Sequence, residues 1–200
     1  SGEVESVCVL PGALENRVYY AVKRTIGGQT KRFLEKLARR DECDGRPESR
    51  CADSHVIYSG FATQTITGLS HLNGESVVVW GYTSEATGKD LGTFTVASGQ
   101  ITGLPETVTH ACVGLGYSAT FKSSKLAYAA ALGSALTQKK KVNRLGLILA
   151  DTHYQGIEFG QDFDTMDNLP LIEDGTTTAA NTVWADFDGP MTTVPGEWDT

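Results

Sequence analysis

The chain has 200 residues, of which 40% are hydrophobic and 20% charged, an ordinary composition for a folded globular protein. The formal net charge of −7 argues against a surface that grips nucleic-acid phosphates through excess basic residues. No apolar run approaches the ~20 residues that a membrane-spanning helix needs. The chain starts at Ser1 without Met and carries neither the basic start nor the apolar core of a signal peptide, so we expect a non-secreted segment of a longer polypeptide.

Residues 1–38 are expected to form a β meander. Residues 4–10 and 17–23 have strand composition and are joined by a loop with Pro-Gly and Asn, which favours a hairpin. Gly27 and Gly28 predict a tight turn, and residues 30–37 a third strand, a composition typical of most of one β-propeller blade. The apolar spacing of residues 32–40 also fits a helix, and the strand is the preferred reading.

Residues 39–54 are rich in charge and contain Gly45 and Pro47, which predicts a solvated linker between two sheet units. A disulfide between Cys43 and Cys51 would close a loop here, although assembly in a cytoplasm favours free thiols. Cys8 and Cys112 alternate with Val in strand-like runs, so we expect them to be small buried side chains.

Residues 55–123 read as a small antiparallel β-barrel or sandwich, because short runs of β-forming residues alternate with short turns. The expected strands include residues 77–80, 93–96, 108–113 and 116–121. Gly74 is assigned to a turn, and Trp80 and Tyr117 to the core. Residues 82–92 form a long polar loop, in which Tyr82 is a candidate partner contact.

The next segment, residues 124–144, is interpreted as a helix or a basic loop. Residues 126–136 are rich in Ala and Leu and favour a helix, which Gly133 weakens. A basic run follows, and it is either a solvated face or an electrostatic contact with an acidic subunit or with DNA. The candidate contact residues of this run are Lys139, Lys140, Lys141 and Arg144.

Residues 145–200 are turn-rich and acidic, with strands expected only at residues 145–150, 156–159 and 182–187. An irregular region of this length is unusual in a compact monomer. We therefore expect it to pack against a neighbouring domain or subunit, with Trp184 and Trp198 as anchors.

The sequence contains no recognisable catalytic or metal-binding motif. Residues 81–90 have six residues between the glycines and Asp90 after Lys89, which departs from a phosphate-binding loop. The four histidines, among them His71 in a turn, have no recognisable partner for a triad. Residues 162–168 lack the Gly and the distal Glu of a calcium loop. The sequence predicts no enzyme, no metal and no cofactor.

Several segments, in order, resemble one protein family. They are residues 19–35 (YYAVKRTIGGQTKRFLE), 68–75 (GLSHLNGE), 94–102 (FTVASGQIT), 113–117 (VGLGY) and 195–199 (PGEWD). This ordered set is similar to the tail nozzle proteins of short-tailed bacteriophages, also called tail tubular protein B or stabilisation protein. The family has an extended loop where this chain has the Ala-rich residues 126–136.

The resemblance implies a mainly β protein in which a small barrel is inserted in, or flanked by, β-propeller-like strands, with at most one or two short helices. It implies a homohexameric tube in the virion tail, assembled in the bacterial host cytoplasm. Such a tube seals the genome, conducts double-stranded DNA during ejection and contacts a tail adaptor and tail fibres or spikes. Residues 145–200 would then return to the propeller or platform. No catalytic residue carries over, because the role is mechanical.

Two other readings stay open at this stage. One is a β-sandwich binding module of a phage or bacterial surface protein, in which exposed Tyr82, Tyr154 and Trp198 stack on sugar rings. The other is a hydrolase whose catalytic residues come together only in the fold. A tube subunit would bury much of its surface against identical copies, whereas a binding module would not need to.

Overall fold

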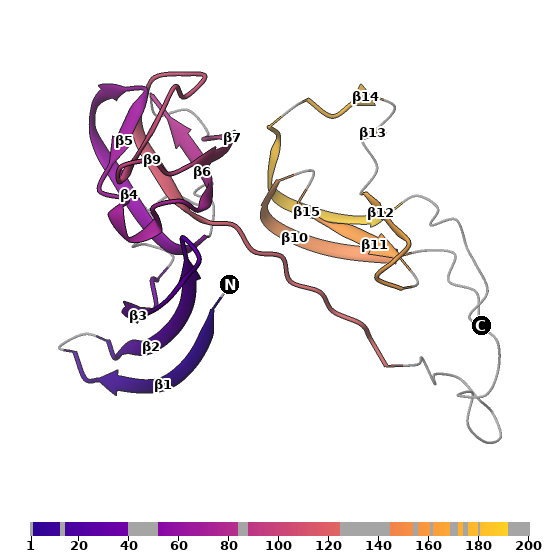
Figure 1. Ribbon diagram of the computed structural model, residues 1–200. Coiled ribbons are helices and arrows are strands. Elements are labelled where there is room, and N and C mark those ends of the chain that lie inside the picture. Colours follow the sequence, from indigo (N-terminus) through magenta and orange to yellow (C-terminus); the bar gives the residue numbers. More distant parts are fainter. Residues whose placement is uncertain are drawn as a thin grey trace. The chain divides into compact units, whose positions relative to one another are not determined.

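The computed structural model describes residues 2–12, 15–39, 52–83, 88–124, 145–153, 156–160, 162–168, 172–173, 176–179 and 181–191. These residues form antiparallel strands and one short 3-10 helix, so the predicted mainly β fold is confirmed (Figure 1). None of the sheets closes into a barrel among these residues. The elements are β1 (Glu3–Leu10), β2 (Arg17–Ile26), β3 (Gln29–Lys36), β4 (Asp53–Thr63), β5 (Thr65–Thr67), η2 (Ser70–Leu72), β6 (Ser76–Tyr82), β7 (Lys89–Thr95), β8 (Gln100–Thr102), β9 (Val108–Leu115), β10 (Leu145–His153), β11 (Glu158–Gly160), β12 (Met166–Asn168), β13 (Ile172–Glu173), β14 (Thr176–Thr177) and β15 (Val183–Met191).

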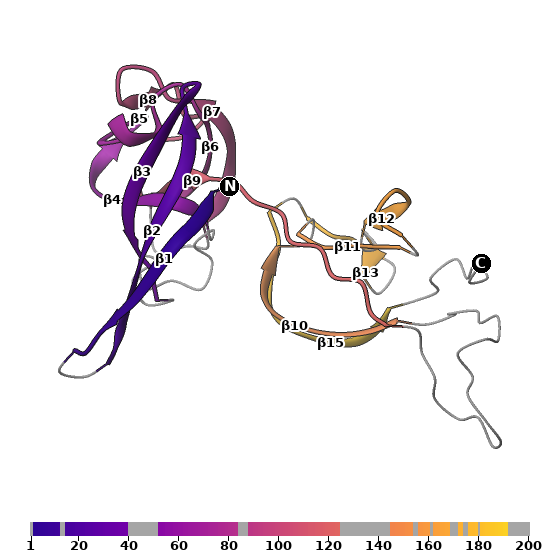
Figure 2. The same cartoon turned by 60° about the horizontal axis from the view of Figure 1, so that its bottom comes forward.

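The first sheet has the strand order β1-β2-β3 and is the predicted meander. Ile26 pairs with Gln29, so a two-residue turn joins β2 to β3. Its residues, Gly27 and Gly28, have φ of 58° and 74°, the left-handed backbone that tight hairpin turns require. Residues 29–36 form strand β3, which excludes the helical alternative there. The ends of β1 and β2 that lead into their connecting loop extend away from strands β4 to β9 (Figure 2). The propeller-like assignment remains a prediction.

The second sheet has the order β4-β9-β6-β7, and β5 and β8 form a separate two-stranded sheet. The strands predicted at residues 77–80, 93–96 and 108–113 correspond to β6, β7 and β9. Ile66, Val79 and Val113 are fully buried, and Trp80 beside Val79 and Cys112 beside Val113 are buried as well. The polar loop predicted at residues 82–92 is shorter in the structure, because β6 runs to Tyr82 and β7 starts at Lys89.

The two sheets share one hydrophobic core. Ile26 of β2 belongs to the same buried cluster as Leu69, Leu72 and Val96, and Phe33 of β3 packs against that cluster. Residues 1–117 accordingly form one compact unit and residues 118–200 another. This division differs from the predicted boundaries at residues 38 and 54, and β4 begins at Asp53, inside the predicted linker.

Three expectations about the first unit are wrong. Residues 116–121 form no strand, because β9 ends at Leu115 and the residues that follow are exposed and belong to no sheet. Tyr117 lies just beyond that end and is 56% exposed, so it is not a core residue. Cys8 is exposed on edge strand β1, whereas Cys112 is buried as expected. For Cys8 the predicted strand is present, but every residue of β1 is exposed.

Among its described residues, the second unit contains three two-stranded sheets, β10–β15, β11–β12 and β13–β14. Strands β10, β11 and β15 coincide with, or overlap, the strands predicted at residues 145–150, 156–159 and 182–187. Trp184 is half-buried, whereas the other predicted anchor, Trp198, lies outside the described residues. The Cys43–Cys51 pair and the helix predicted at residues 126–136 lie outside them as well. Within the described ranges, no helix has the length and hydropathy to cross a membrane.

Candidate functional site: a buried ion network between two sheets

Arg24 occupies a position on the buried face of β2, where the alternation of the strand predicts an apolar side chain. Val22, Arg24 and Ile26 point to the same face of the sheet, and all three are buried, with Arg24 only 4% exposed. Arg24 donates from Nε and Nη2 to the two carboxylate oxygens of Glu35 on β3, at 2.9 and 2.8 Å. This two-pronged pairing is the strongest arrangement for a guanidinium and a carboxylate, and it satisfies a charge that burial would otherwise penalise.

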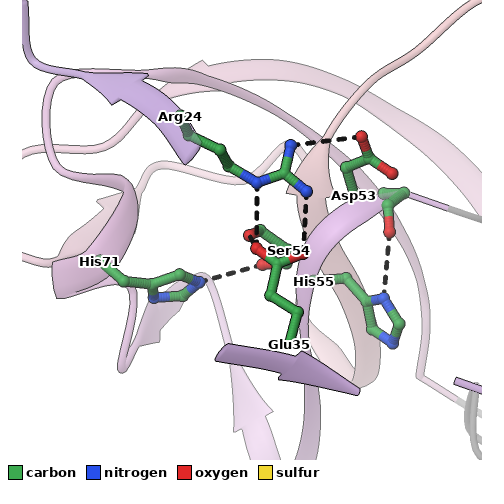
Figure 3. A network of polar contacts seen from close by, with 7 residues as sticks. Arg24, Glu35, Asp53, Ser54, His55 and His71 are labelled. Atoms are coloured by element: carbon green, nitrogen blue, oxygen red, sulfur yellow. Dashed lines mark hydrogen bonds and ion pairs between the residues drawn. The ribbon is translucent and has the colours of Figure 1, made fainter. Parts of the chain in front are cut away.

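Strand β4 supplies the other half of the network (Figure 3). The Oδ2 atom of Asp53 lies 3.4 Å from Nη1 of Arg24, and the Ser54 hydroxyl donates to Oε1 of Glu35. Ser54 has φ of 50°, and the pairing of β4 with β9 shifts register between Asp53 and Val56. This irregularity at the start of β4 turns both side chains toward the first sheet.

The electrostatics of the cluster follow from these contacts. Burial raises the pKa of Glu35, but the hydrogen bonds from Arg24 and Ser54 outweigh burial and lower the pKa below its ordinary value. Hydrogen bonding to Glu35 raises the pKa of Arg24. Burial, together with the nearby carboxylates Glu35 and Asp53, raises the pKa of Tyr20. The network is therefore an ionised cluster with a fixed geometry.

Two histidines border the network, but they do not form a catalytic triad with it. Nε2 of His71 lies 3.0 Å from the backbone oxygen of Ser54, and Nδ1 of His55 lies 3.0 Å from that of Ala52. A triad requires the histidine to accept a proton from the nucleophile's hydroxyl, whereas here that hydroxyl is directed at Glu35. His71 lies in η2, within the turn predicted for it.

A second set of contacts joins the turns. The Gly27 N–H donates to Oε1 of Glu75 at 2.7 Å, across 48 positions of sequence. The Gly99 N–H donates to Oδ1 of Asn73 at 3.1 Å, and the Gly74 N–H to the Val96 oxygen at 2.9 Å. The three segments 19–35, 68–75 and 94–102 thus meet directly, and hydrogen bonds join their turns to one another.

The residues chosen from the sequence fall in different environments. Gly27 and Gly28 occupy the β2–β3 turn, Gly74 has φ of 88° in its turn, and Trp80 is 5% exposed, all as predicted. Tyr82 is not an exposed contact residue, since it is 8% exposed and stacks on the ring of His110 with the centroids 4.9 Å apart. The basic candidates, Lys139, Lys140, Lys141 and Arg144, lie outside the described residues.

The sequence reading missed the network itself. One signal was available: Arg24 stands between Val22 and Ile26 at even spacing on a strand whose other residues on that face are Val18 and Tyr20. An arginine among apolar residues on one face of a strand indicates a carboxylate partner, because buried arginines are almost always paired. Which of the chain's 24 acidic residues supplies it depends on the tertiary fold.

The acidic turn at residues 162–168 is organised by its own side chain. Oδ1 of Asp162 accepts the N–H groups of Asp164 and Thr165 at 3.0 and 2.9 Å, and the hydroxyl of Thr165 as well. These bonds lower the pKa of Asp162. In the portion of the chain that the structure describes, no three His, Cys, Asp or Glu side chains are grouped so as to hold a metal ion.

In comparisons with known proteins, no protein-family model matches the chain, and no curated protein sequence is significantly similar to it.

Proposed function

We propose that this chain is a structural subunit of the tail nozzle of a short-tailed bacteriophage, a tube that seals and conducts the genome. The observation that carries the proposal is the convergence of the three resembling segments, 19–35, 68–75 and 94–102, at one place. They are joined by the Gly27–Glu75 and Asn73–Gly99 hydrogen bonds. The segments that resemble the family are therefore in contact with one another in the fold. This is expected if the chain and the family share the same local structure.

The interactions that stabilise residues 1–117 also support a mechanical role. The β1-β2-β3 sheet and the β4-β9-β6-β7 sheet share a continuous core and are linked by a buried ion network. Removing one member of such a network is costly, so the sheets resist sliding past each other. A tube wall that bears the pressure of packaged DNA needs this resistance, and a net charge of −7 disfavours tight binding of the passing DNA.

The experiment is to image the purified chain by negative-stain electron microscopy and to measure its mass in solution by light scattering. We expect ring-shaped particles with an axial channel. Antibodies raised against the chain should also label the tail of the phage particles that contain it. A stable monomer without ring particles, together with unlabelled tails, would refute the proposal.

The glycan-binding alternative loses one of its three aromatic residues. Tyr82 is buried against His110, so its ring is not available to stack on a sugar. Tyr154 and Trp198 lie outside the described residues. A monomeric chain that binds an array of glycans would favour this alternative over the nozzle.

A further inference from the structure

The two edges of the β1-β2-β3 sheet carry opposite charge. Among the described residues, neither the outer edge of β1 nor that of β3 pairs with a further strand. Strand β1 contains Glu3 and Glu5 and no basic residue. Strand β3 contains Lys31, Arg32 and Lys36, and its single carboxylate, Glu35, is turned to Arg24. One edge is therefore acidic and the other basic.

Both edges also expose apolar side chains. Every residue of β1 is exposed, and Val7 and Val9 are 61% and 56% accessible to solvent. On β3 Leu34 is 77% exposed, and Leu37 just after the strand is 57% exposed. A long edge strand with exposed apolar side chains is a template for pairing with another strand, and natural proteins use charge to control which strand pairs with it.

We propose that the sheet continues from one copy of the chain to the next, with β1 of one copy paired to β3 of a second copy. Three edge-to-edge pairings are conceivable for identical copies. Pairing β1 with β1 would bring two acidic edges together, and pairing β3 with β3 two basic ones, and like charges on adjacent strands are destabilising. Only the β1–β3 pairing joins opposite charges.

The register within the sheet supports this choice. Glu3 and Arg32 both pair with Lys23, so they stand at the same level on the two edges. When a second copy is added in the same register and orientation, its Glu3 lies beside Arg32 of the first. Arg32 has 68% of its side chain exposed and Glu3 66%, so both can reach across although each already has a partner within its own chain.

The apolar positions match in the same arrangement. Leu37 donates its N–H to the oxygen of Val18, and Val18 pairs with Val9, so Leu37 and Val9 share a level and a face. In the joined sheet, Leu37 of one copy covers Val9 of the next. A head-to-tail contact of this type repeats from copy to copy and gives either a closed ring or an open filament. The inference rests on the proposed function for the expectation that copies assemble, and it names the contact between them.

A charge-exchange experiment tests the pairing. The variant Glu3→Lys/Glu5→Lys makes both edges basic, and the variant Lys31→Glu/Arg32→Glu makes both acidic. We expect each variant alone to dissociate at concentrations at least about tenfold higher than those at which the native chain dissociates, because the edges now repel. An equimolar mixture should regain assembly, since each acidic edge again meets a basic one. Mass photometry and sedimentation velocity report the outcome.

Controls separate a charge effect at the edges from general damage. Glu158→Lys/Asp164→Lys reverses two exposed charges in the other unit and should leave assembly unchanged. Both edge variants lose exposed ion pairs within the chain, so circular dichroism and melting must confirm that they fold. Val9→Lys breaks no such pair, adds a positive charge to the β1 edge and should weaken assembly as well.

The possible results are distinct. If the native chain assembles but neither the charge variants nor Val9→Lys weaken it, the β1–β3 contact is wrong while the nozzle proposal stands. If folded variants dissociate but their mixture does not reassemble, the opposite-charge pairing is wrong. If the native chain remains a monomer at every concentration, the β1–β3 contact is wrong, and the proposed tube is wrong as well when the antibodies also leave the phage tails unlabelled.

Discussion

The described parts of residues 1–117 and of residues 118–200 are both built from antiparallel strands, yet they are stabilised differently. In the first unit, two multi-stranded sheets enclose a core in which Leu72, Val79 and Val113 are fully buried. In the second unit, the described sheets have two strands each, and no described side chain is buried. An isolated two-stranded sheet is marginally stable in water. Strand content alone therefore says little about stability, which depends on whether a sheet face is covered.

The largest loss of stability is expected when a core side chain is removed from the first unit. Leu72→Ala should lower the free energy of unfolding of residues 1–117 by about 2–5 kcal/mol, because it removes buried methyl groups and leaves a cavity. Urea unfolding followed by tryptophan fluorescence measures the change. The matched variant is Ile148→Ala in the second unit, where the side chain is 84% exposed, and it should change stability by less than about 0.5 kcal/mol. Equal effects would contradict the comparison.

The next largest effect should come from the ion network. Glu35→Gln leaves the buried Arg24 without its main counter-charge and should cost about 3 kcal/mol in unfolding free energy. Glu5→Gln removes a carboxylate that pairs with exposed Arg32, and its effect should be far smaller because solvent screens that pair. Thermal melting of the two variants side by side tests the difference. A Glu35→Gln variant as stable as Glu5→Gln would mean that the network does not pin the sheets.

Acid should weaken the same network. The folded-state pKa of Glu35 is lowered from 4.5, so its stabilising contribution is present above about pH 4.5 and is lost as the pH falls through the folded value. We expect the melting temperature of the native chain to fall more steeply below that pH than the melting temperature of Glu35→Gln. Parallel slopes from pH 6 to pH 3 would show that Glu35 is not the titrating group responsible.

The smallest effect concerns the turn that joins β2 to β3. Gly27→Ala places a Cβ atom 3.3 Å from the Asn73 oxygen in a left-handed backbone, which should cost about 1 kcal/mol. Gly146→Ala is the control, because an added Cβ there meets nothing within 4 Å, and it should change the melting temperature little. If the two variants melt alike, the Gly27 turn does not depend on glycine.

The buried and exposed tyrosines show the limit of reading a sheet from its sequence. Tyr82 and Tyr117 both flank β-forming runs, and the sequence placed the first in a loop and the second in the core. The structure reverses both, because β6 continues to Tyr82 and β9 ends before Tyr117. Local β propensity does not fix where a strand ends, since the last residues of a strand depend on the length of the strand beside it.

The antiparallel, mainly β character, the β1–β2–β3 meander and the turn at Gly27 and Gly28 could all be predicted from the sequence. These features follow from local rules, namely side-chain alternation and the backbone freedom of glycine. The shared core of the meander and the second sheet, and the network that joins Arg24 to Glu35 and Asp53, became visible only in the folded chain. Alternation gives every strand two faces, and which face is covered, and by what, depends on segments far away in the chain.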